Sequence, residues 1–157
     1  MVGVDRDRVA LDTVAQTMRE AASGAAPVEL LEADLEGGPW PLPHRRFGAV
    51  VVTNYLWRPL LPTLVDSVDD GGVLLYETFA AGNETVGRPS RADFLLQPGE
   101  LLQAVAAQLR VVAYEDGFLD DPPRFLQRIA AVRVPPGAVA PRFPLAQALP
   151  GVTPGDR

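Results

Sequence analysis

The chain has 157 residues, enough for one domain with a substantial core, and ordinary contents of 47% hydrophobic and 22% charged residues. Its lack of cysteine excludes a disulfide framework, a thiolate metal site and a cysteine nucleophile. A net charge of −6 excludes the basic field that drives general nucleic-acid binding, and no apolar stretch has the roughly 18 residues of a membrane span. We therefore expect a cytoplasmic protein that binds neither nucleic acid, membrane nor metal.

The first part of the chain predicts a strand, a helix and a second strand. A short apolar run opens the chain and ends at Asp5. Apolar residues at helical spacing follow, with Asp7 as the expected N-cap and Gly24 as the expected end of the helix. Residues 28–31 predict a short strand, and a loop rich in glycine and proline comes after it.

The middle of the chain predicts two buried strands that flank a helix. Residues 47–53 form a continuous apolar run, as expected of a strand buried on both faces. Residues 59–68 predict a helix with Pro59 in its first turn, closed by the Asp70-Gly71-Gly72 turn. Residues 73–79 predict the second buried strand. The segment 80–100 has no clean period and predicts a long loop, which in a compact domain is usually functional or mobile.

The last part predicts a helix at 100–109 and strands at 110–118 and 124–134, joined by an acidic loop. Strands that alternate with helices indicate a Rossmann-like α/β fold, with a mostly parallel sheet and helices on both faces. The final two strands have no helix between them, so we expect them to be antiparallel neighbours. This domain is expected over residues 1–134, and the proline-rich residues 135–157 predict a tail.

Polar residues follow the apolar runs directly, at the strand ends where open parallel sheets bind ligands. They are Asp5, Asp34, Asn54 with Tyr55, and Glu77 with Thr78. A carboxylate at Asp5 suits ribose hydroxyls, and one at Asp34 suits an adenine amino group, with Leu35 against the ring. We expect Asn54 to shape the reacting end of this pocket, and Tyr55 and Trp57 to form its wall.

Plainer roles compete with each of these interpretations. Asp5 also suits a helix cap or a solvated turn, Asp34 suits a loop carboxylate, and the aromatic residues suit a core or its rim. His44, the only histidine, stands in a proline-containing loop and is expected to be a solvated side chain.

Several segments match one family in both order and spacing. They are VGVDRD at 2–7, the stretch from VELLEADL to VVVTNYL at 28–56, DDGGVLLYETF at 69–79, a helix, and the final strand pair. Together they resemble class I S-adenosylmethionine-dependent methyltransferases over about residues 2–134. The TNYL and YETFAAGNE segments look closest to small-molecule methyltransferases of the tellurite-resistance-like group.

That resemblance implies S-adenosylmethionine as cofactor and a small-molecule methyl acceptor. Asp5 matches the residue that binds the cofactor ribose, and Arg6 matches the position that flanks the adenine. Asp34 and Leu35 match the pair at the adenine edge and face, and Asn54 with Tyr55 matches the end next to the methionine portion. No catalytic residue is predicted, because the sulfonium cofactor carries the electrophile and alignment provides much of the acceleration.

The resemblance also implies a first strand and a glycine-rich loop, whose place would lie before Met1. We therefore expect an N-terminally truncated methyltransferase, active once that segment is restored. The missing strand would lie between the strand that ends at Asp5 and the one that ends at Thr53. Without it, these two strands either pair directly or keep exposed edges.

Two other functions stay open. A nicotinamide-dinucleotide-binding Rossmann protein also has an acidic residue after its second strand, although the antiparallel final pair and the short length argue against it. A non-catalytic remnant would act by self-association, which an uncovered strand edge and apolar helix faces favour.

Overall fold

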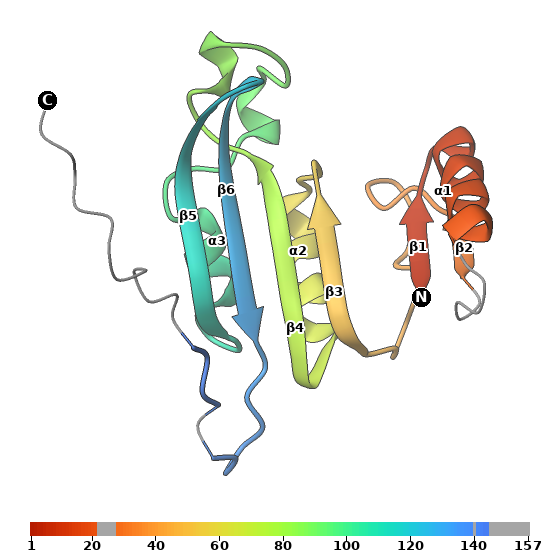
Figure 1. Cartoon of the computed structure of the whole chain (residues 1–157), viewed down its shortest axis with the longest axis vertical. Coiled ribbons are helices and arrows are strands. Elements are labelled where there is room, and N and C mark those ends of the chain that lie inside the picture. Colours follow the sequence, from red (N-terminus) through yellow and green to blue (C-terminus); the bar gives the residue numbers. More distant parts are fainter. Residues whose placement is uncertain (22–27, 140, 145–157) are drawn as a thin grey trace, which may run out of the picture.

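The computed structural model describes residues 1–21, 28–139 and 141–144. The elements, in chain order, are β1 (Val2–Asp5), α1 (Arg8–Ala21), β2 (Glu29–Glu32), β3 (Phe47–Thr53), α2 (Leu61–Asp66), β4 (Val68–Phe79), α3 (Glu100–Val105), β5 (Arg110–Asp120) and β6 (Pro123–Val132) (Figure 1). A 3₁₀ turn, Arg58–Leu60, leads into α2, and two further 3₁₀ turns lie in the loop between β4 and α3. None of the described helices combines the length and apolar character that crossing a membrane requires.

The strands form two separate sheets rather than one. β1 pairs with β2 in parallel, and the other four strands lie in the order β3-β4-β6-β5. β3 and β4 are parallel, whereas β6 runs antiparallel to both β4 and β5. The predicted α/β class and the predicted antiparallel final pair are confirmed. β1 and β3 have not closed up on each other, and Figure 1 shows the space between them.

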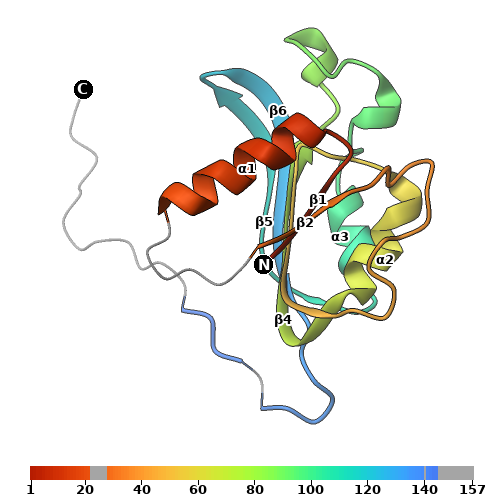
Figure 2. The same cartoon turned by 90° about the vertical axis from the view of Figure 1, so that its right-hand side faces the viewer.

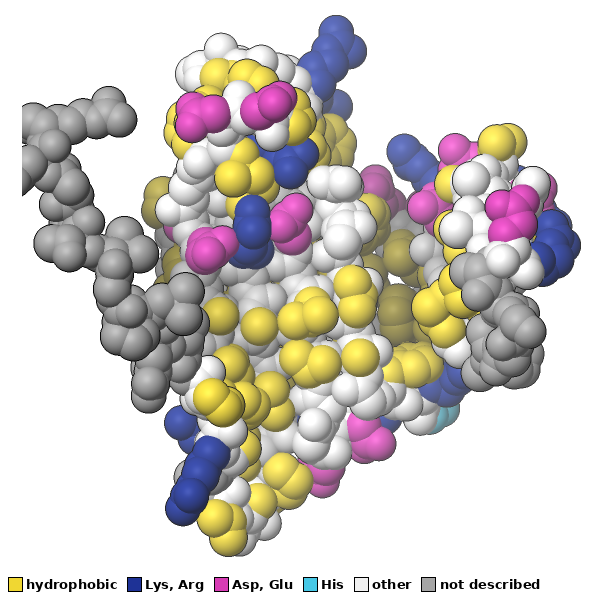
Figure 3. All heavy atoms as spheres, viewed as in Figure 1, with side chains coloured by type: hydrophobic (Ala, Val, Ile, Leu, Met, Phe, Trp, Pro, Cys, Tyr) yellow, Lys and Arg dark blue, Asp and Glu magenta, His cyan; other side chains and the backbone are white. Residues whose placement is uncertain are grey.

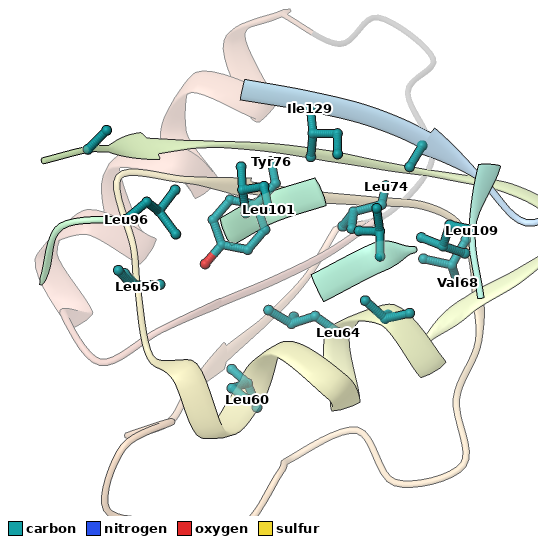
Figure 4. Packing of buried hydrophobic residues seen from close by; sticks show 14 residues of the cluster. Leu56, Leu60, Leu64, Val68, Leu74, Tyr76, Leu96, Leu101, Leu109 and Ile129 are labelled. Carbon is teal, nitrogen blue, oxygen red and sulfur yellow. The ribbon is translucent and has the colours of Figure 1, made fainter. Parts of the chain in front are cut away.

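The core lies on one face of the four-stranded sheet. Leu64 of α2 and Leu101 of α3 are buried against Leu74 of β4 and Ile129 of β6 (Figure 4). α1 packs on β1 and β2 instead, and Figure 2 shows it on the opposite side of the strands from α2 and α3. Helices therefore lie on both sides of the strands, as predicted, but they cover different strands.

The prediction that residues 47–53 and 73–79 are buried on both faces is wrong. Val51 of β3 is 63% exposed and Leu75 of β4 is 43% exposed, whereas the neighbouring Leu74 is 2% exposed. The reason is that α2 and α3 cover one face of these strands, and no described helix covers the other. Hydrophobic side chains consequently lie in rows across the open face of the sheet (Figure 3).

Local signals in the sequence fix several element boundaries. The carboxylate oxygen Oδ1 of Asp7 accepts hydrogen bonds from the backbone N–H groups of Val9 (2.8 Å) and Ala10 (3.3 Å), so the predicted N-cap is confirmed. The predicted end of this helix, Gly24, lies outside the described residues. The predicted helices at 59–68 and 100–109 are shorter than expected. The first begins as a 3₁₀ turn and continues as α2 only to Asp66, and the second ends at Val105.

The one-sided burial predicts opposite results for two adjacent leucines of β4. Leu74→Ala leaves a cavity among buried side chains and is expected to lower the free energy of unfolding by about 2–5 kcal/mol. Leu75→Ala removes the same atoms from the open face and is expected to cost less than about 1 kcal/mol. Urea unfolding measures both values, and equal losses would contradict the one-sided core.

Candidate functional site

One cavity of about 910 Å³ lies between β1 and β3 and extends past the carboxyl ends of β1, β2 and β3. Five of the six sequence-predicted site residues line it: Asp5, Arg6, Asp34, Leu35 and Tyr55. Figure 3 shows the hollow between the four-stranded sheet and the unit of β1, α1 and β2. Residues from three strand ends, separated by up to 50 positions in the chain, thus meet at one place.

Asp5 ends β1 and is exposed. Its Oδ1 accepts a hydrogen bond from the backbone N–H of Asp7 (2.8 Å), and its carbonyl oxygen accepts one from Ala33 (3.0 Å). The first bond holds the turn into α1, which is the plainer role considered above. The second ties the ends of β1 and β2 together, so that Asp5 and Asp34 stay at the same edge of this small sheet.

Asp34 follows β2 and organises a tight loop. Its Oδ1 accepts a hydrogen bond from the Glu36 N–H (3.0 Å), and its carbonyl oxygen accepts one from Gly38 (2.9 Å). The backbone N–H groups of Glu36 and Gly37 lower the pKa of the Asp34 carboxyl group, and the nearby charge of Arg6 acts in the same direction. A Cβ atom at Gly38 would lie 2.8 Å from the Asp34 carbonyl oxygen, so this loop requires glycine there.

Tyr55 lines the cavity after the end of β3, and its backbone is held by Tyr76 of the core. The buried Tyr76 donates its hydroxyl hydrogen bond to the Tyr55 carbonyl oxygen (2.7 Å), and burial raises the pKa of Tyr76 far above its ordinary value. The hydroxyl of Tyr55 is buried and has no hydrogen-bond partner among the described residues. Burial, with the negative charges of Glu36 and Asp34, raises the pKa of Tyr55. Tyr55 therefore keeps its proton and can donate it in a hydrogen bond.

Asn54 is the predicted site residue that does not line the cavity. It is exposed, has a φ of 54°, and donates its backbone N–H to the Glu77 carbonyl oxygen (2.9 Å). Asparagine tolerates this left-handed backbone better than most residues, so Asn54 shapes the turn out of β3. Glu77 forms an ion pair with Arg128 (3.2 Å), and Thr78 is buried.

Sequence reasoning missed the group that holds the long loop. Arg58 binds both carboxylate oxygens of Glu100 (2.7 and 3.0 Å), and it donates to the carbonyl oxygens of Asp93 (2.8 Å) and Leu95 (2.9 Å). The partners lie 35 to 42 residues away along the chain, so no short motif contains them. We call this set the Arg58 clamp; it attaches the loop to the start of α2.

The comparisons with known proteins place this fold. No family model matches the chain, and no curated protein matches it. Three solved structures have similar folds. TehB from Haemophilus influenzae matches with a TM-score of 0.61 and 15% identity, and the N-methyltransferase NodS from Bradyrhizobium japonicum WM9 with a TM-score of 0.59 and 13% identity. The magnesium protoporphyrin IX methyltransferase ChlM from Synechocystis PCC 6803, solved with bound SAH, matches with a TM-score of 0.61 and 12% identity. They match 84%, 85% and 84% of this chain. The chain therefore shares the fold of class I S-adenosylmethionine-dependent methyltransferases.

The matched structures are longer than this chain. The 157 residues span 49% of TehB, 73% of NodS and 63% of ChlM. The chain thus corresponds to about half the length of the first of these proteins. At identities of 12–15%, the similarity establishes the fold alone.

The Arg58 clamp predicts a large difference between two arginines near the loop. Arg58→Ala leaves Glu100 with only the Gln97 N–H as donor, removes the side-chain donor of two carbonyl oxygens, and is expected to lower the free energy of unfolding by about 1–3 kcal/mol. Arg91→Ala breaks an ion pair whose side chains are more than 70% exposed, and is expected to cost less than about 1 kcal/mol. Thermal or urea unfolding checks both, and an equal effect would contradict the clamp.

The same clamp predicts a loss of stability in acid. Burial acts to raise the pKa of Glu100, but the hydrogen bonds from Arg58 and from the Gln97 N–H outweigh it, and the net pKa lies below the ordinary value of 4.5. A lowered pKa in the folded state stabilises the fold above pH 4.5, and this contribution is lost as the pH falls through the lowered pKa. Glu100→Gln is therefore expected to flatten the stability profile below pH 4.5, measured by urea unfolding; an unchanged profile would contradict this assignment.

Proposed function

We propose that this protein is an S-adenosylmethionine-dependent methyltransferase that acts on a small molecule. The observation that carries the proposal is the placement of two carboxylates, Asp5 and Asp34, at the ends of the neighbouring strands β1 and β2. Both line one cavity with Leu35 and Tyr55, in a fold shared with methyltransferases.

The groups in the cavity fit a nucleoside cofactor. Carboxylates at Asp5 and Asp34 accept hydrogen bonds from hydroxyl and amino groups. The pKa of the Asp34 carboxyl group lies below its ordinary value because backbone N–H groups already bond it. Leu35 offers an apolar surface to a flat ring. The buried hydroxyl of Tyr55 has no partner among the described residues and is available as a donor. Arg6 adds a positive charge at the same edge.

S-adenosylmethionine, when bound, supplies a methyl group on a positively charged sulfur. The chain then has to hold the cofactor and the acceptor in line and keep water out. We assign this positioning to Tyr55, which lines the cavity. Trp57 and the loop fixed by the Arg58 clamp do not line this cavity, so the wall expected at Trp57 is not found there. A general base is optional for this chemistry and depends on the acceptor, since only an acceptor whose reacting atom carries a proton has to lose one.

The charge of the chain supports a small-molecule acceptor. One solved structure with a similar fold is a 16S rRNA (adenine(1408)-N(1))-methyltransferase (TM-score 0.56, 21% identity), so the fold alone does not select the acceptor. Phosphate backbones are bound by clusters of lysine and arginine. This chain has no lysine and a net charge of −6. A methylation assay that offers a small-molecule panel and ribosomal RNA separately tests this choice.

We also propose that residues 1–157 supply one half of the cofactor site. The other half would be the first strand and glycine-rich loop that the resemblance implies, in a segment outside these residues. The space between β1 and β3 supports this proposal, because a strand placed there would end at the same edge as Asp5 and Tyr55. Activity is expected once that segment is joined to the chain.

Binding of S-adenosylhomocysteine tests the cofactor site without requiring turnover. In an NMR titration of the ¹⁵N-labelled chain, millimolar S-adenosylhomocysteine is expected to shift the amide signals of Asp5, Asp34 and Leu35. Asp5→Asn keeps the shape but removes the charge, and loss of a charged hydrogen bond is expected to weaken binding by about tenfold or more. Asp7→Asn is the control, because Asp7 caps the same helix and does not line the cavity.

Three outcomes would contradict the proposed function. One is that S-adenosylhomocysteine shifts none of these amides. A second is that Asp5→Asn and Asp7→Asn weaken binding equally, which would make the effect one of helix capping. The third is that NAD, titrated in parallel, binds at this edge and S-adenosylhomocysteine does not.

A further inference from the structure

The open face of the four-stranded sheet carries two arginines of β6. Leu75 of β4 is exposed on this face, and it is the register partner of Ala130. Because side chains alternate along a strand, Arg128 and Arg124 lie on the same face as Ala130. Ile129, in contrast, is buried in the core beneath the sheet. The two arginines can therefore be compared directly, as guanidinium groups on one strand and one face.

The charge of Arg128 is neutralised by its neighbours. Its Nε lies 3.2 Å from an oxygen of Glu77 on β4 and 3.1 Å from an oxygen of Glu115 on β5. The Nε–H group is not directed at either oxygen, so these contacts are ion pairs rather than hydrogen bonds. The three side chains form one row across the sheet, because Arg128 is the register partner of both glutamates. With two carboxylates beside one guanidinium, this row has an excess of negative charge and offers nothing to an anion.

Arg124 has no such partner among the described residues. Its Nε is buried without a hydrogen-bond partner, and Arg124 forms no ion pair with Asp120 or Asp121 of the adjoining turn. The side chain as a whole is only half-buried, so an anion can reach the guanidinium from the surface. A buried donor without an acceptor costs free energy, which an incoming acceptor restores. Arg124 is therefore the arginine of this face that is available to an anion.

The backbone next to Arg124 is fixed by the loop that follows β4. The Phe125 N–H donates to the side-chain oxygen of Asn83 (3.1 Å), and the Phe125 carbonyl oxygen accepts a hydrogen bond from the Ala80 N–H (3.0 Å). Asn83 is itself buried, and its amide group donates to the Pro89 carbonyl oxygen (3.0 Å). These bonds hold the start of β6 in place, so that little backbone has to be ordered when a ligand binds at Arg124.

Arg124 lies at the end of the sheet where the proposed cofactor site is. Phe79, the last residue of β4, is the register partner of Leu126, which follows Arg124 on the same face. Figure 1 shows the β5–β6 hairpin reaching past this end of β4. β4 lies between β6 and β3, the strand that leads to Tyr55, and two spacings between strands amount to about 10 Å. A small molecule can span this distance.

We propose that Arg124 binds an oxyanion of the methyl acceptor, either a carboxylate or a phosphate group. The planar guanidinium donates parallel hydrogen bonds that match the geometry of both groups, and such charge-assisted bonds are stronger than neutral ones. That the ligand is the acceptor rests on the proposed function. The anion site itself rests only on Arg124 and its surroundings.

The acidic surroundings favour a small anion over a polyanion. Asp120 and Asp121 stand in the same hairpin, and Glu77 and Glu115 lie further down the same face with an excess of negative charge. The whole chain has a net charge of −6. A polyanion such as RNA would meet repulsion along its length, whereas a single oxyanion needs only the guanidinium group. The acceptor that fits Arg124 is therefore a small molecule with one anionic group near its end.

Titration with free anions tests this site on the chain alone, without cofactor. Inorganic phosphate and acetate are added separately to the ¹⁵N-labelled chain, at fixed pH and at an ionic strength held constant with sodium chloride. The Nε–H signal of Arg124 reports binding by NMR. At least one of the two anions is expected to shift this signal saturably, with millimolar affinity. The anion that binds more tightly identifies the group as a phosphate or a carboxylate.

Two variants with the same change of net charge locate the binding. Arg124→Gln removes the charged donor and is expected to weaken the anion by about tenfold or more. Arg46→Gln removes an exposed arginine at the opposite end of the sheet, directly before β3, and is expected to leave the affinity unchanged.

Two results would overturn the proposal. One is that neither anion shifts the Arg124 signal saturably in the unaltered chain, a result that does not depend on how well a variant folds. The other is that Arg124→Gln and Arg46→Gln weaken binding equally, which would make the effect one of net charge. Binding of S-adenosylhomocysteine is measured separately, so failure of the anion site leaves the cofactor site standing, and the reverse also holds.

Discussion

The separation of β1 from β3 is the constraint on which the rest of this structure depends. β4 is paired on both sides, so it holds β3 and β6 and carries the leucine-rich core beneath it. β1 and β3 are each paired on one side only, and their free edges face each other across an apolar space. An unpaired backbone edge next to apolar side chains can pair with a further strand. The position of the cavity between β1 and β3 follows from this separation.

The candidate site lies where this separation meets the strand ends. Asp5 and Asp34 are held together by the pairing of β1 and β2, whereas Tyr55 reaches the cavity from β3. The two halves of the site thus belong to different sheets. The strand that we propose for the space between β1 and β3 would join the sheets and fix the distance between the carboxylates and Tyr55.

Local signals in the sequence were sufficient for much of the fold. Asp7 was predicted as the N-cap of α1, and the apolar run predicted the bounds of β3. The absence of a helical pattern between β5 and β6 predicted that they pair antiparallel. The two-sided burial of β3 was predicted wrongly. A continuous apolar run shows that both faces of a strand suit apolar contacts, but it does not show whether a helix covers each face. The Arg58 clamp left no signal, since it joins residues that only the folded chain brings together. Of the predicted site, Asp5, Arg6, Asp34, Leu35 and Tyr55 share the cavity, but their role toward a cofactor stays a prediction.

The most direct measurement of the central claim is amide hydrogen exchange of β3 in the chain alone. Alternation predicts that the N–H groups of Val50 and Val52, which point toward β4, exchange slowly. The Asn54 N–H donates to β4, so by alternation the N–H groups of Val51 and Thr53 point away from β4 into the space between β1 and β3. They are predicted to exchange close to the rate of an exposed backbone. Equal protection of all four amides would contradict the account, because it would mean that β1 and β3 pair directly or that another strand already lies between them.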